Sequence, residues 1–308
     1  MLFDPELYLL LNPDVKRAGI DPYEHYKLYG KCECRQISPA GNKPKDWTYK
    51  RILDPEFFNH FIWCTDICEK WIGSSKRILD FGCGMDITGL GLSLRYNHEI
   101  VGVDISPMIN YLPLIAKQQI GLEYLPNNIS LHQIQEGLNL QDFGLFDAII
   151  AWSVFEHVDL QYMSQIIRNF KEILKPGGVI FIQIEPMWLS PFGSHLQLFL
   201  KEPWAHLVHD RDTIRSMVHS AAEPQNFQLS LGNTQTWDQA KTSQLMEFDK
   251  LNRIKIDDII TMFSEAGFKL IREERNQIKI DPPYSLKNKY SDEDLKTNEV
   301  RLLFTCYT

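Results

Sequence analysis

Short apolar runs alternate along the middle of the chain with longer stretches whose apolar residues recur at helical spacing. The runs predict buried strands near residues 77–81, 99–103, 129–134, 146–151, 179–185, 268–275 and 299–306. Helical spacing predicts a helix from about Asp86 to Tyr96, a second after Asp159 that ends at Lys175–Gly178, and a third over 257–266. This alternation is typical of an α/β fold with a mostly parallel sheet.

The first predicted strand runs directly into a glycine turn, Asp80-Phe81-Gly82-Cys83-Gly84. A dinucleotide site needs a third glycine so that the backbone can approach a pyrophosphate, but Ile87 stands at that position. Asp80 before the turn and Asp86 after it would also repel a phosphate. The turn therefore favours a cationic ligand.

An acid also closes the second predicted strand. Asp104 lies where the ribose-binding acid of a nucleotide site is found, and its carboxylate can accept hydrogen bonds from both ribose hydroxyls. S-adenosylmethionine carries a ribose, an ammonium and a sulfonium, and it has no phosphate. The pair of strands therefore predicts a site for S-adenosylmethionine.

These residues resemble the class I S-adenosylmethionine-dependent methyltransferases, whose D/E-x-G-x-G turn is matched by Asp80–Gly84 and whose ribose acid is matched by Asp104. Asp86 replaces a frequent third glycine, and we expect it to cap the following helix. The resemblance implies a Rossmann-like, seven-stranded, mostly parallel sheet with the last strand antiparallel. The cofactor residues that it implies are Asp80, Gly82, Cys83, Gly84, Asp104, Ile105, Glu136 and Trp152.

Residues 186–256 form an insertion between the fifth strand and the helix at 257–266, too long for a plain connection. We expect this insertion to be a helical lid over the substrate. His195 and His206 lie in its aromatic and proline-rich turns, which suit a polar acceptor such as a sugar. Packing of the lid is the alternative role for each histidine.

Glu156 and His157 follow the fourth predicted strand. Removing a proton from a hydroxyl acceptor requires a base with a pKa near neutrality, which points to histidine. The candidate catalytic residues are His157, Glu156, His195 and His206. By resemblance, a Glu-His pair here holds a divalent metal in ubiquinone-pathway O-methyltransferases, but Ser153 replaces their further glutamate, so a metal is not favoured.

Residues 1–37 read as a separate small helical module, with proline at the first position of each helix. They are similar to a short unit attached to bacterial surface-glycan enzymes, which implies a glycan-assembly partner. Residues 38–46 are a linker by composition, and 47–308 form the methyltransferase domain.

Composition narrows the classes of function. The net charge is −8 and the pI about 5.6, which disfavour nucleic-acid binding. Six cysteines without a C-x-x-C pair are expected to be free thiols. No apolar stretch is long enough for a membrane span, and no basic leader opens the chain, so we expect a cytoplasmic protein.

Together these features predict an O-methyltransferase that uses S-adenosylmethionine on a hydroxyl of a sugar or surface-glycan intermediate, with a histidine removing the proton. Two alternatives stay open. The acceptor could be a quinone, phenol, amine or phosphate-type oxygen, or the chain could be a non-catalytic scaffold that binds the cofactor.

Overall fold

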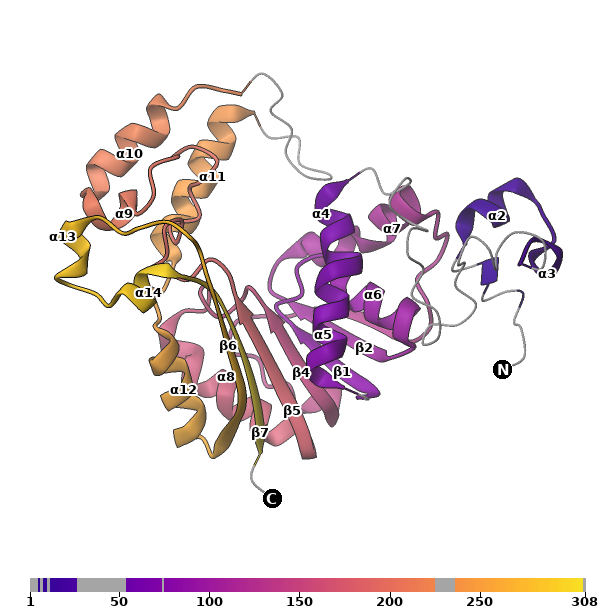
Figure 1. The fold of residues 1–308 in the computed structure, drawn as a ribbon. Coiled ribbons are helices and arrows are strands. Elements are labelled where there is room, and N and C mark those ends of the chain that lie inside the picture. The colour runs from indigo at the N-terminus through magenta and orange to yellow at the C-terminus, as the bar shows by residue number, and fades with distance from the viewer. Residues whose placement is uncertain are drawn as a thin grey trace. The chain divides into compact units, whose positions relative to one another are not determined.

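A seven-stranded mixed sheet with the order β3-β2-β1-β4-β5-β7-β6 organises the chain (Figure 1). The structure is a computed structural model, and it describes residues 5, 8–9, 12–26, 54–73, 75–224 and 236–306. The strands are β1 Arg77–Phe81, β2 Glu99–Asp104, β3 Ile129–Gln133, β4 Phe146–Trp152, β5 Leu174–Ile184, β6 Phe268–Gln277 and β7 Thr297–Cys306. All seven strands predicted from the apolar runs are present.

The register of the sheet aligns the carboxyl ends of the first two strands. β1 pairs in parallel with β2 on one side and β4 on the other, so that Leu79 lies opposite Val101 and Ile149. β7 pairs antiparallel with both β5 and β6. The expected antiparallel last strand is therefore confirmed, and the turn after β1 begins beside the end of β2.

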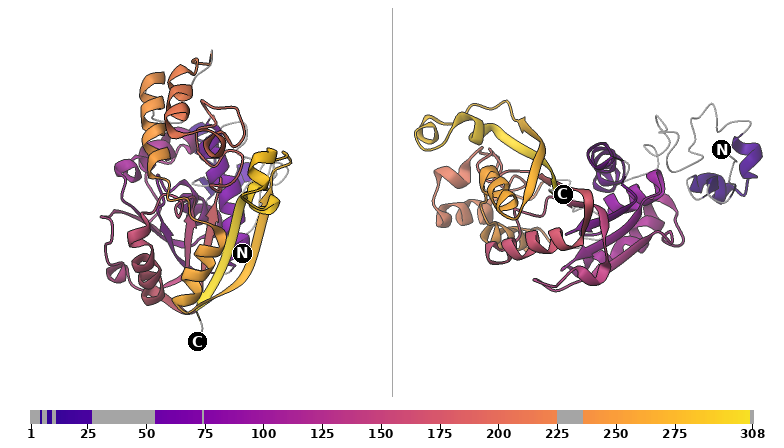
Figure 2. Two further views of the ribbon diagram at one scale, coloured as in Figure 1. Left: turned by 90° about the vertical axis from the view of Figure 1, so that its left-hand side faces the viewer. Right: turned by 90° about the horizontal axis from the view of Figure 1, so that it is seen from below.

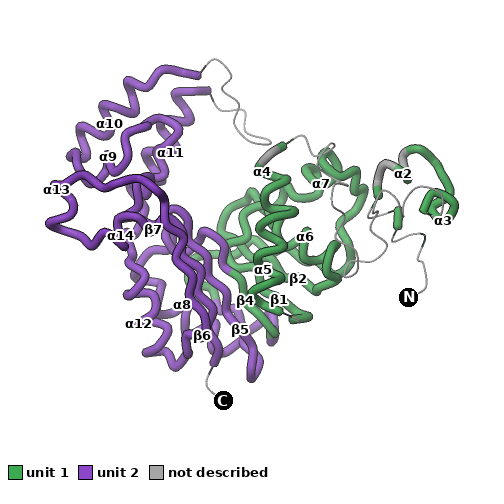
Figure 3. Tube along the Cα trace, viewed as in Figure 1, with its two compact units in different colours: residues 1–138, 146–150 green, residues 139–145, 151–308 purple. Residues whose placement is uncertain are grey.

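The chain divides into two compact units (Figure 3), residues 1–138 with 146–150 and residues 139–145 with 151–308. The helices of the first unit are α2 Pro13–Ala18, α3 Pro22–His25, α4 Pro55–Phe58, π-helical η2 Asn59–Cys64, α5 Thr65–Ile72, α6 Ile87–Tyr96, the 3-10 turn η3 Pro107–Tyr111 and α7 Leu112–Ile120. Those of the second unit are the 3-10 turn η4 Gln141–Phe143, α8 Leu160–Ile173, α9 Ala205–Val208, α10 Arg211–Ser220, α11 Trp237–Lys250, α12 Ile256–Glu265, α13 Tyr284–Lys287 and α14 Asp292–Lys296.

In the first unit, α6 packs against the segment that precedes β1. The buried Arg95 guanidinium donates to the carbonyl oxygens of Phe61 and Ile62 at 3.1 and 3.0 Å and pairs with Asp66 at 2.7 Å. These bonds satisfy carbonyl groups inside η2, where the helical ladder is irregular. Phe57, Phe61 and Trp71, which precede β1, are buried.

In the second unit, the described part of the 186–256 insertion has a hydrophobic core of its own. Figures 1 and 2 show α10 and α11 side by side. The cluster includes Leu196, Phe199, Leu200, Ala205, Ile214, Val218, Trp237, Ala240, Leu245, Phe248 and Leu251. Because the insertion buries its own apolar side chains, it can hold a defined shape next to a binding pocket.

One boundary differs from the prediction. α8 ends at Ile173, and the chain is already extended at Leu174, so that Lys175–Gly178 belongs to the start of β5 and not to the end of the helix. Pro176 disfavours helical backbone at Lys175, which explains why the helix stops early. The Thr305 hydroxyl then donates to the Gly178 carbonyl oxygen at 2.9 Å, next to the β5–β7 pairing.

The described part of the N-terminal module contains the two predicted helices α2 and α3, each with proline at its start. The His25 ring lies 2.9 Å from the Tyr8 hydroxyl. The 38–46 linker and Cys32 and Cys34 lie outside the described residues, and Cys64, Cys68, Cys83 and Cys306 are thiols. Of the helices in the described residues, none is both long and apolar enough to cross a membrane.

Candidate functional site

The glycine turn after β1 is held to the end of β2 by backbone hydrogen bonds. The amides of Gly82 and Cys83 donate to the Val103 carbonyl oxygen at 2.8 and 3.2 Å. The Asp104 carboxylate accepts from the Gly84 amide at 2.6 Å through one oxygen and from the Ser106 amide at 2.7 Å through the other. The predicted ribose acid is therefore fixed in place by the turn that it follows.

The surface of this turn is open. Gly84 has a φ of 56°, and a Cβ added there would meet no atom within 4 Å. Ile105, directly after Asp104, leaves 53% of its side chain exposed beside the polar turn. Open backbone, a fixed carboxylate and an exposed apolar side chain are the surfaces that a nucleoside with a charged tail requires. The residues present therefore fit S-adenosylmethionine.

Three acids surround the turn, and two of them are buried. Burial, opposed by the neighbouring Asp86 and assisted by the charge of Asp104, raises the pKa of Asp80 to about 7. Burial and the adjacent Asp80 raise the pKa of Asp86 well above its usual range. Burial also raises the pKa of the Cys83 thiol. At neutral pH the turn therefore carries less negative charge than three ionised carboxyl groups would give. A cation bound beside the turn would lower the pKa of these carboxyl groups and so increase their negative charge.

Asp86 does not cap α6 as expected. It occupies the N-cap position with a φ of 54°, but its side chain makes no capping hydrogen bond. The carboxyl group points into the protein, where Cβ atoms built on Gly89 and Gly102 would lie 1.9 and 2.4 Å from its oxygens. Neither oxygen has a hydrogen-bond partner. The carboxyl group thus lies beside Gly89, the third residue of α6, without a capping hydrogen bond.

The remaining cofactor candidates lie at strand ends. Glu136 is exposed in the turn that follows β3. Trp152, the last residue of β4, is half-buried, and its ring meets the edge of Phe181 at a centroid distance of 6.1 Å.

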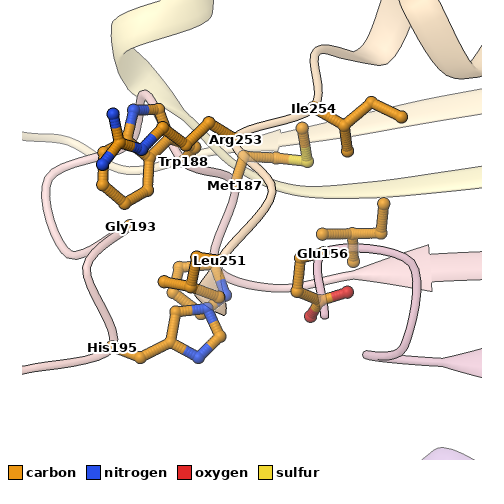
Figure 4. Close-up of a pocket in the computed structure, with 10 residues that line it drawn as sticks. Glu156, Met187, Trp188, Gly193, His195, Leu251, Arg253 and Ile254 are labelled. Atoms are coloured by element: carbon orange, nitrogen blue, oxygen red, sulfur yellow. The ribbon is translucent and has the colours of Figure 1, made fainter. Parts of the chain in front are cut away.

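The second unit contains a small pocket between the 186–256 insertion and the ends of β4 and β5 (Figure 4). It is lined by Glu156, Ile184, Pro186, Met187, Trp188, Gly193, His195, Leu251, Arg253 and Ile254. The lining is mainly apolar, with polar atoms contributed by Glu156, His195 and Arg253.

Two predicted catalytic residues line this pocket with unsatisfied polar atoms. Neither carboxyl oxygen of Glu156 has a partner, and burial raises the pKa of Glu156 to about 8. His195 has a φ of 59°, and its Nε2 atom has no partner either. Burial, and then the neighbouring His157, lower the pKa of His195 to about 4. Both groups are therefore neutral at pH 7 and can exchange hydrogen bonds with a ligand.

His157 lies beside this pocket wall, with its ring edge-on to His195 at a centroid distance of 5.2 Å. Its Nδ1 atom is 3.9 Å from Oε2 of Glu247 on α11, an acid that the sequence pattern did not single out. Burial lowers the pKa of His157, and Glu247 opposes that effect. Ligand atoms of Glu156, His157 and His195 lie within 4.8 Å of one another, a spacing that could also hold a metal ion.

His206 lies away from the pocket lining and holds Trp188. Its Nε2–H donates to the Trp188 carbonyl oxygen at 2.7 Å, and the two rings meet edge-on at 4.8 Å. Burial lowers the pKa of His206 to about 4. The Arg253 guanidinium lies over the Trp188 ring, 4.7 Å from its centroid. Sequence reasoning missed Arg253 because nothing in a lone arginine indicates that it lines a pocket.

Asn252 ties the pocket's two sides together. Its side-chain amide donates to the carbonyl oxygens of Phe155 and Val158 at 2.5 and 2.7 Å. Its backbone amide donates to the backbone carbonyl oxygen of Glu156 at 3.0 Å. The loop that carries Arg253 is therefore fixed to the loop that carries Glu156 and His157. Nothing in the run Leu251-Asn252-Arg253 distinguishes this asparagine from one in an ordinary loop.

A mostly parallel sheet with a glycine turn after one strand and an acid at the end of the next is typical of nucleotide-cofactor sites. A family model described as a methyltransferase domain matches residues 63–273, and the chain belongs to that family.

Curated relatives match parts of the chain. A ubiquinone biosynthesis O-methyltransferase of Nitrosococcus oceani is 31% identical over 108 residues, 35% of this chain and 43% of that protein. Phosphoethanolamine N-methyltransferase 1 of Zea mays is 22% identical over 193 residues, 63% of this chain and 36% of that protein. The chain thus spans less than half the length of these relatives. The solved CcbJ methyltransferase from Streptomyces caelestis has a TM-score of 0.48 and 11% identity, covering 81% of this chain and 90% of that one.

Replacing Asp86 by glycine is expected to stabilise the protein. The change replaces a non-glycine residue in the left-handed conformation and removes two buried oxygens that have no hydrogen-bond partner among the described residues. Glycine also raises the conformational entropy of the unfolded chain, which offsets part of this gain. We expect a net gain of about 1 kcal/mol, or about 2–4 °C in Tm by calorimetry. Asp86→Asn is the matched control and should gain less, because its amide stays unpartnered. A fall in Tm for Asp86→Gly would show that the carboxyl group stabilises the turn.

Burial of Glu156 predicts a loss of stability as pH rises. Its carboxyl ionises near pH 4.5 in the unfolded chain but near pH 8 in the folded protein, so the folded state binds more protons between these values. The free energy of unfolding should therefore fall with pH across this window. Asp80 contributes in the same direction, so urea unfolding of wild type is compared with Glu156→Gln at each pH. Equal slopes for the two proteins would contradict a raised pKa at Glu156.

Proposed function

We propose that this protein is an S-adenosylmethionine-dependent methyltransferase that methylates a hydroxyl group of a sugar or surface-glycan intermediate. The observation that carries the cofactor half is the Asp104 carboxylate, held by the amides of Gly84 and Ser106 at the end of β2 in a chain of the methyltransferase family. When bound, the cofactor supplies an electrophilic methyl group.

The residues of the turn have separate tasks in this proposal. Asp104 accepts hydrogen bonds from the ribose hydroxyls with the lone pairs that its two amide contacts leave free. Ile105 provides an apolar surface for the adenine. Asp80, whose pKa is near 7, takes on negative charge when a cation binds nearby. Glu136 and Trp152 are proposed as further contacts of the adenosyl group.

The acceptor half rests on the pocket of the second unit. Met187, Leu251 and Ile254 offer apolar surface. Glu156 and His195 offer neutral polar atoms that have no hydrogen-bond partner among the described residues. This combination suits a sugar, whose ring has apolar faces and whose edge carries hydroxyls. The resemblance of the N-terminal module to glycan-enzyme units agrees with that acceptor.

His195 is the proposed base because its free Nε2 atom lines the pocket. As the acceptor oxygen forms its bond to the methyl carbon and the carbon–sulfur bond breaks, the hydroxyl becomes strongly acidic and its proton passes to this nitrogen. A weak base is sufficient for such a proton, provided that it is neutral beforehand. His157, with Glu247 at its Nδ1 atom, orients His195, while His206 positions Trp188.

Asp104→Asn should weaken the binding of S-adenosylmethionine at least tenfold, because an amide cannot accept the same set of hydrogen bonds. Isothermal titration of the full chain with S-adenosylmethionine and its demethylated product measures this. Asp212→Asn, an exposed acid on α10, is the control and should leave the affinity unchanged. If the wild type binds a nicotinamide or flavin dinucleotide instead, the proposed chemistry is wrong.

His195→Gln should lower kcat about 100-fold or more without changing the affinity for the cofactor. Because the pKa of His195 is about 4, wild-type kcat should show no inflection near pH 6.5. Turnover is measured with methyl-labelled cofactor against neutral sugars, acidic sugars, phenols and amines.

His219→Gln, an exposed histidine on α10, is the matched control and should retain wild-type kcat. A base mechanism also predicts that EDTA leaves turnover unchanged. Loss of turnover with EDTA, restored by a divalent cation, would assign Glu156, His157 and His195 to a metal instead. Turnover of phenols alone would exclude the glycan acceptor.

A further inference from the structure

We propose that the pocket of the second unit binds an anionic group, a carboxylate or a phosphate, on the acceptor, and that Arg253 is the residue that recognises it. This inference rests on the proposed function, since it names the acceptor class of the same site. It starts from the positive charge of Arg253, which lines the pocket.

Arg253 lines the pocket, yet among the described residues no carboxylate forms an ion pair with it. The nearby arginines of α10 are different, because Arg211 and Arg215 both pair with Asp249. Arg253 is exposed, so its guanidinium can be reached from solvent. A guanidinium has five N–H donors in a fixed plane, which match a carboxylate or a phosphate.

The guanidinium is held in position without its charge being neutralised. The Arg253 and Trp188 side chains lie together in Figure 4. The guanidinium carbon is 4.7 Å from the centroid of the Trp188 ring. Trp188 stacks on Phe248 at 5.9 Å and is bound through its carbonyl by His206. Stacking on an aromatic face orients a guanidinium and leaves its N–H edge free for an anion.

The backbone conformation and the contacts of Asn252 also fix the position of Arg253. Its φ of 61° lies in the left-handed region that side chains rarely adopt, and the neighbouring Asn252 fixes the loop to the carbonyls of Phe155 and Val158. Such strain persists where surrounding contacts determine the conformation, often at binding sites. The position of Arg253 relative to Glu156 is therefore set before any ligand arrives.

The other titratable groups of the pocket wall do not cancel this charge. Glu156 is a buried neutral acid at pH 7, and His195 is a neutral imidazole. Both can bind hydroxyl groups, whereas Arg253 binds an anion. The arrangement fits a hydroxy acid or a sugar that carries a carboxylate or phosphate, with its anion on Arg253 and its hydroxyls toward His195.

The test measures the binding of three small probes to the full chain in the presence of S-adenosylhomocysteine. The probes are glucuronate, glucose 1-phosphate and the neutral methyl glucoside, and NMR saturation transfer gives each Kd. We expect at least one of the two anions to bind about tenfold or more tightly than the neutral sugar. The preference should weaken as salt is raised from about 0.05 to 0.3 M. The two anionic arms distinguish a carboxylate from a phosphate.

Arg253→Gln should remove this preference by weakening the anions about tenfold and leaving the neutral sugar unchanged, and Arg253→Lys should retain part of it. Arg168→Gln, an exposed arginine on α8 outside the pocket, should have no effect. Equal binding of all three probes by the wild type, or equal losses in Arg253→Gln and Arg168→Gln, would overturn the proposal. The salt dependence of the wild type decides the question if Arg253→Gln does not fold.

Failure of this inference differs from failure of the methyltransferase proposal. Transfer of labelled methyl groups to neutral sugars, unaffected by Arg253→Gln, would refute the anion site alone. Binding of anions through Arg253 with no methyl transfer to any acceptor would refute the enzymatic function alone.

Discussion

The hydrogen bonds that the Asp104 carboxylate accepts from Gly84 and Ser106 are the constraint on which the cofactor site depends. A turn that contains two glycines gains no rigidity from its own residues. Each charge-assisted bond to the carboxylate contributes about 1.5–3 kcal/mol and joins the turn to the end of β2. One acid thus shapes the turn and keeps lone pairs free for a ligand.

Burial of acids without counter-ions is common to both units of the protein. Asp80 and Asp86 lie under the glycine turn, and Glu156 lies at the wall of the pocket. Desolvation raises the pKa of all three, because a charged carboxylate without partners is costly in an apolar setting. The three groups are therefore partly or wholly protonated at neutral pH, and binding of a cation beside them would be coupled to loss of their protons.

The pocket in the insertion depends on a different kind of contact. Asn252 satisfies carbonyl groups of the loop after β4 and so joins α11's end to that loop. His206 performs a similar task for Trp188. Polar side chains that bind backbone carbonyls fix the shape of irregular segments, since such segments lack the regular hydrogen bonds of helices and strands. These contacts fix Trp188 and the loop that carries Arg253.

The sequence by itself determined the strands, the glycine turn and the acid after β2, because these depend on local apolar runs and on the backbone freedom of Gly82 and Gly84. It also indicated Glu156 and His195 as members of a site. Only the tertiary structure decided that Asp86 faces inward, and that Glu247 and Arg253 join the histidines. Helix capping is predicted from local sequence, whereas the Asp86 carboxyl packs into the space beside Gly89 and Gly102, which belong to α6 and β2. Contacts between side chains from distant elements leave no periodic signal in a single sequence.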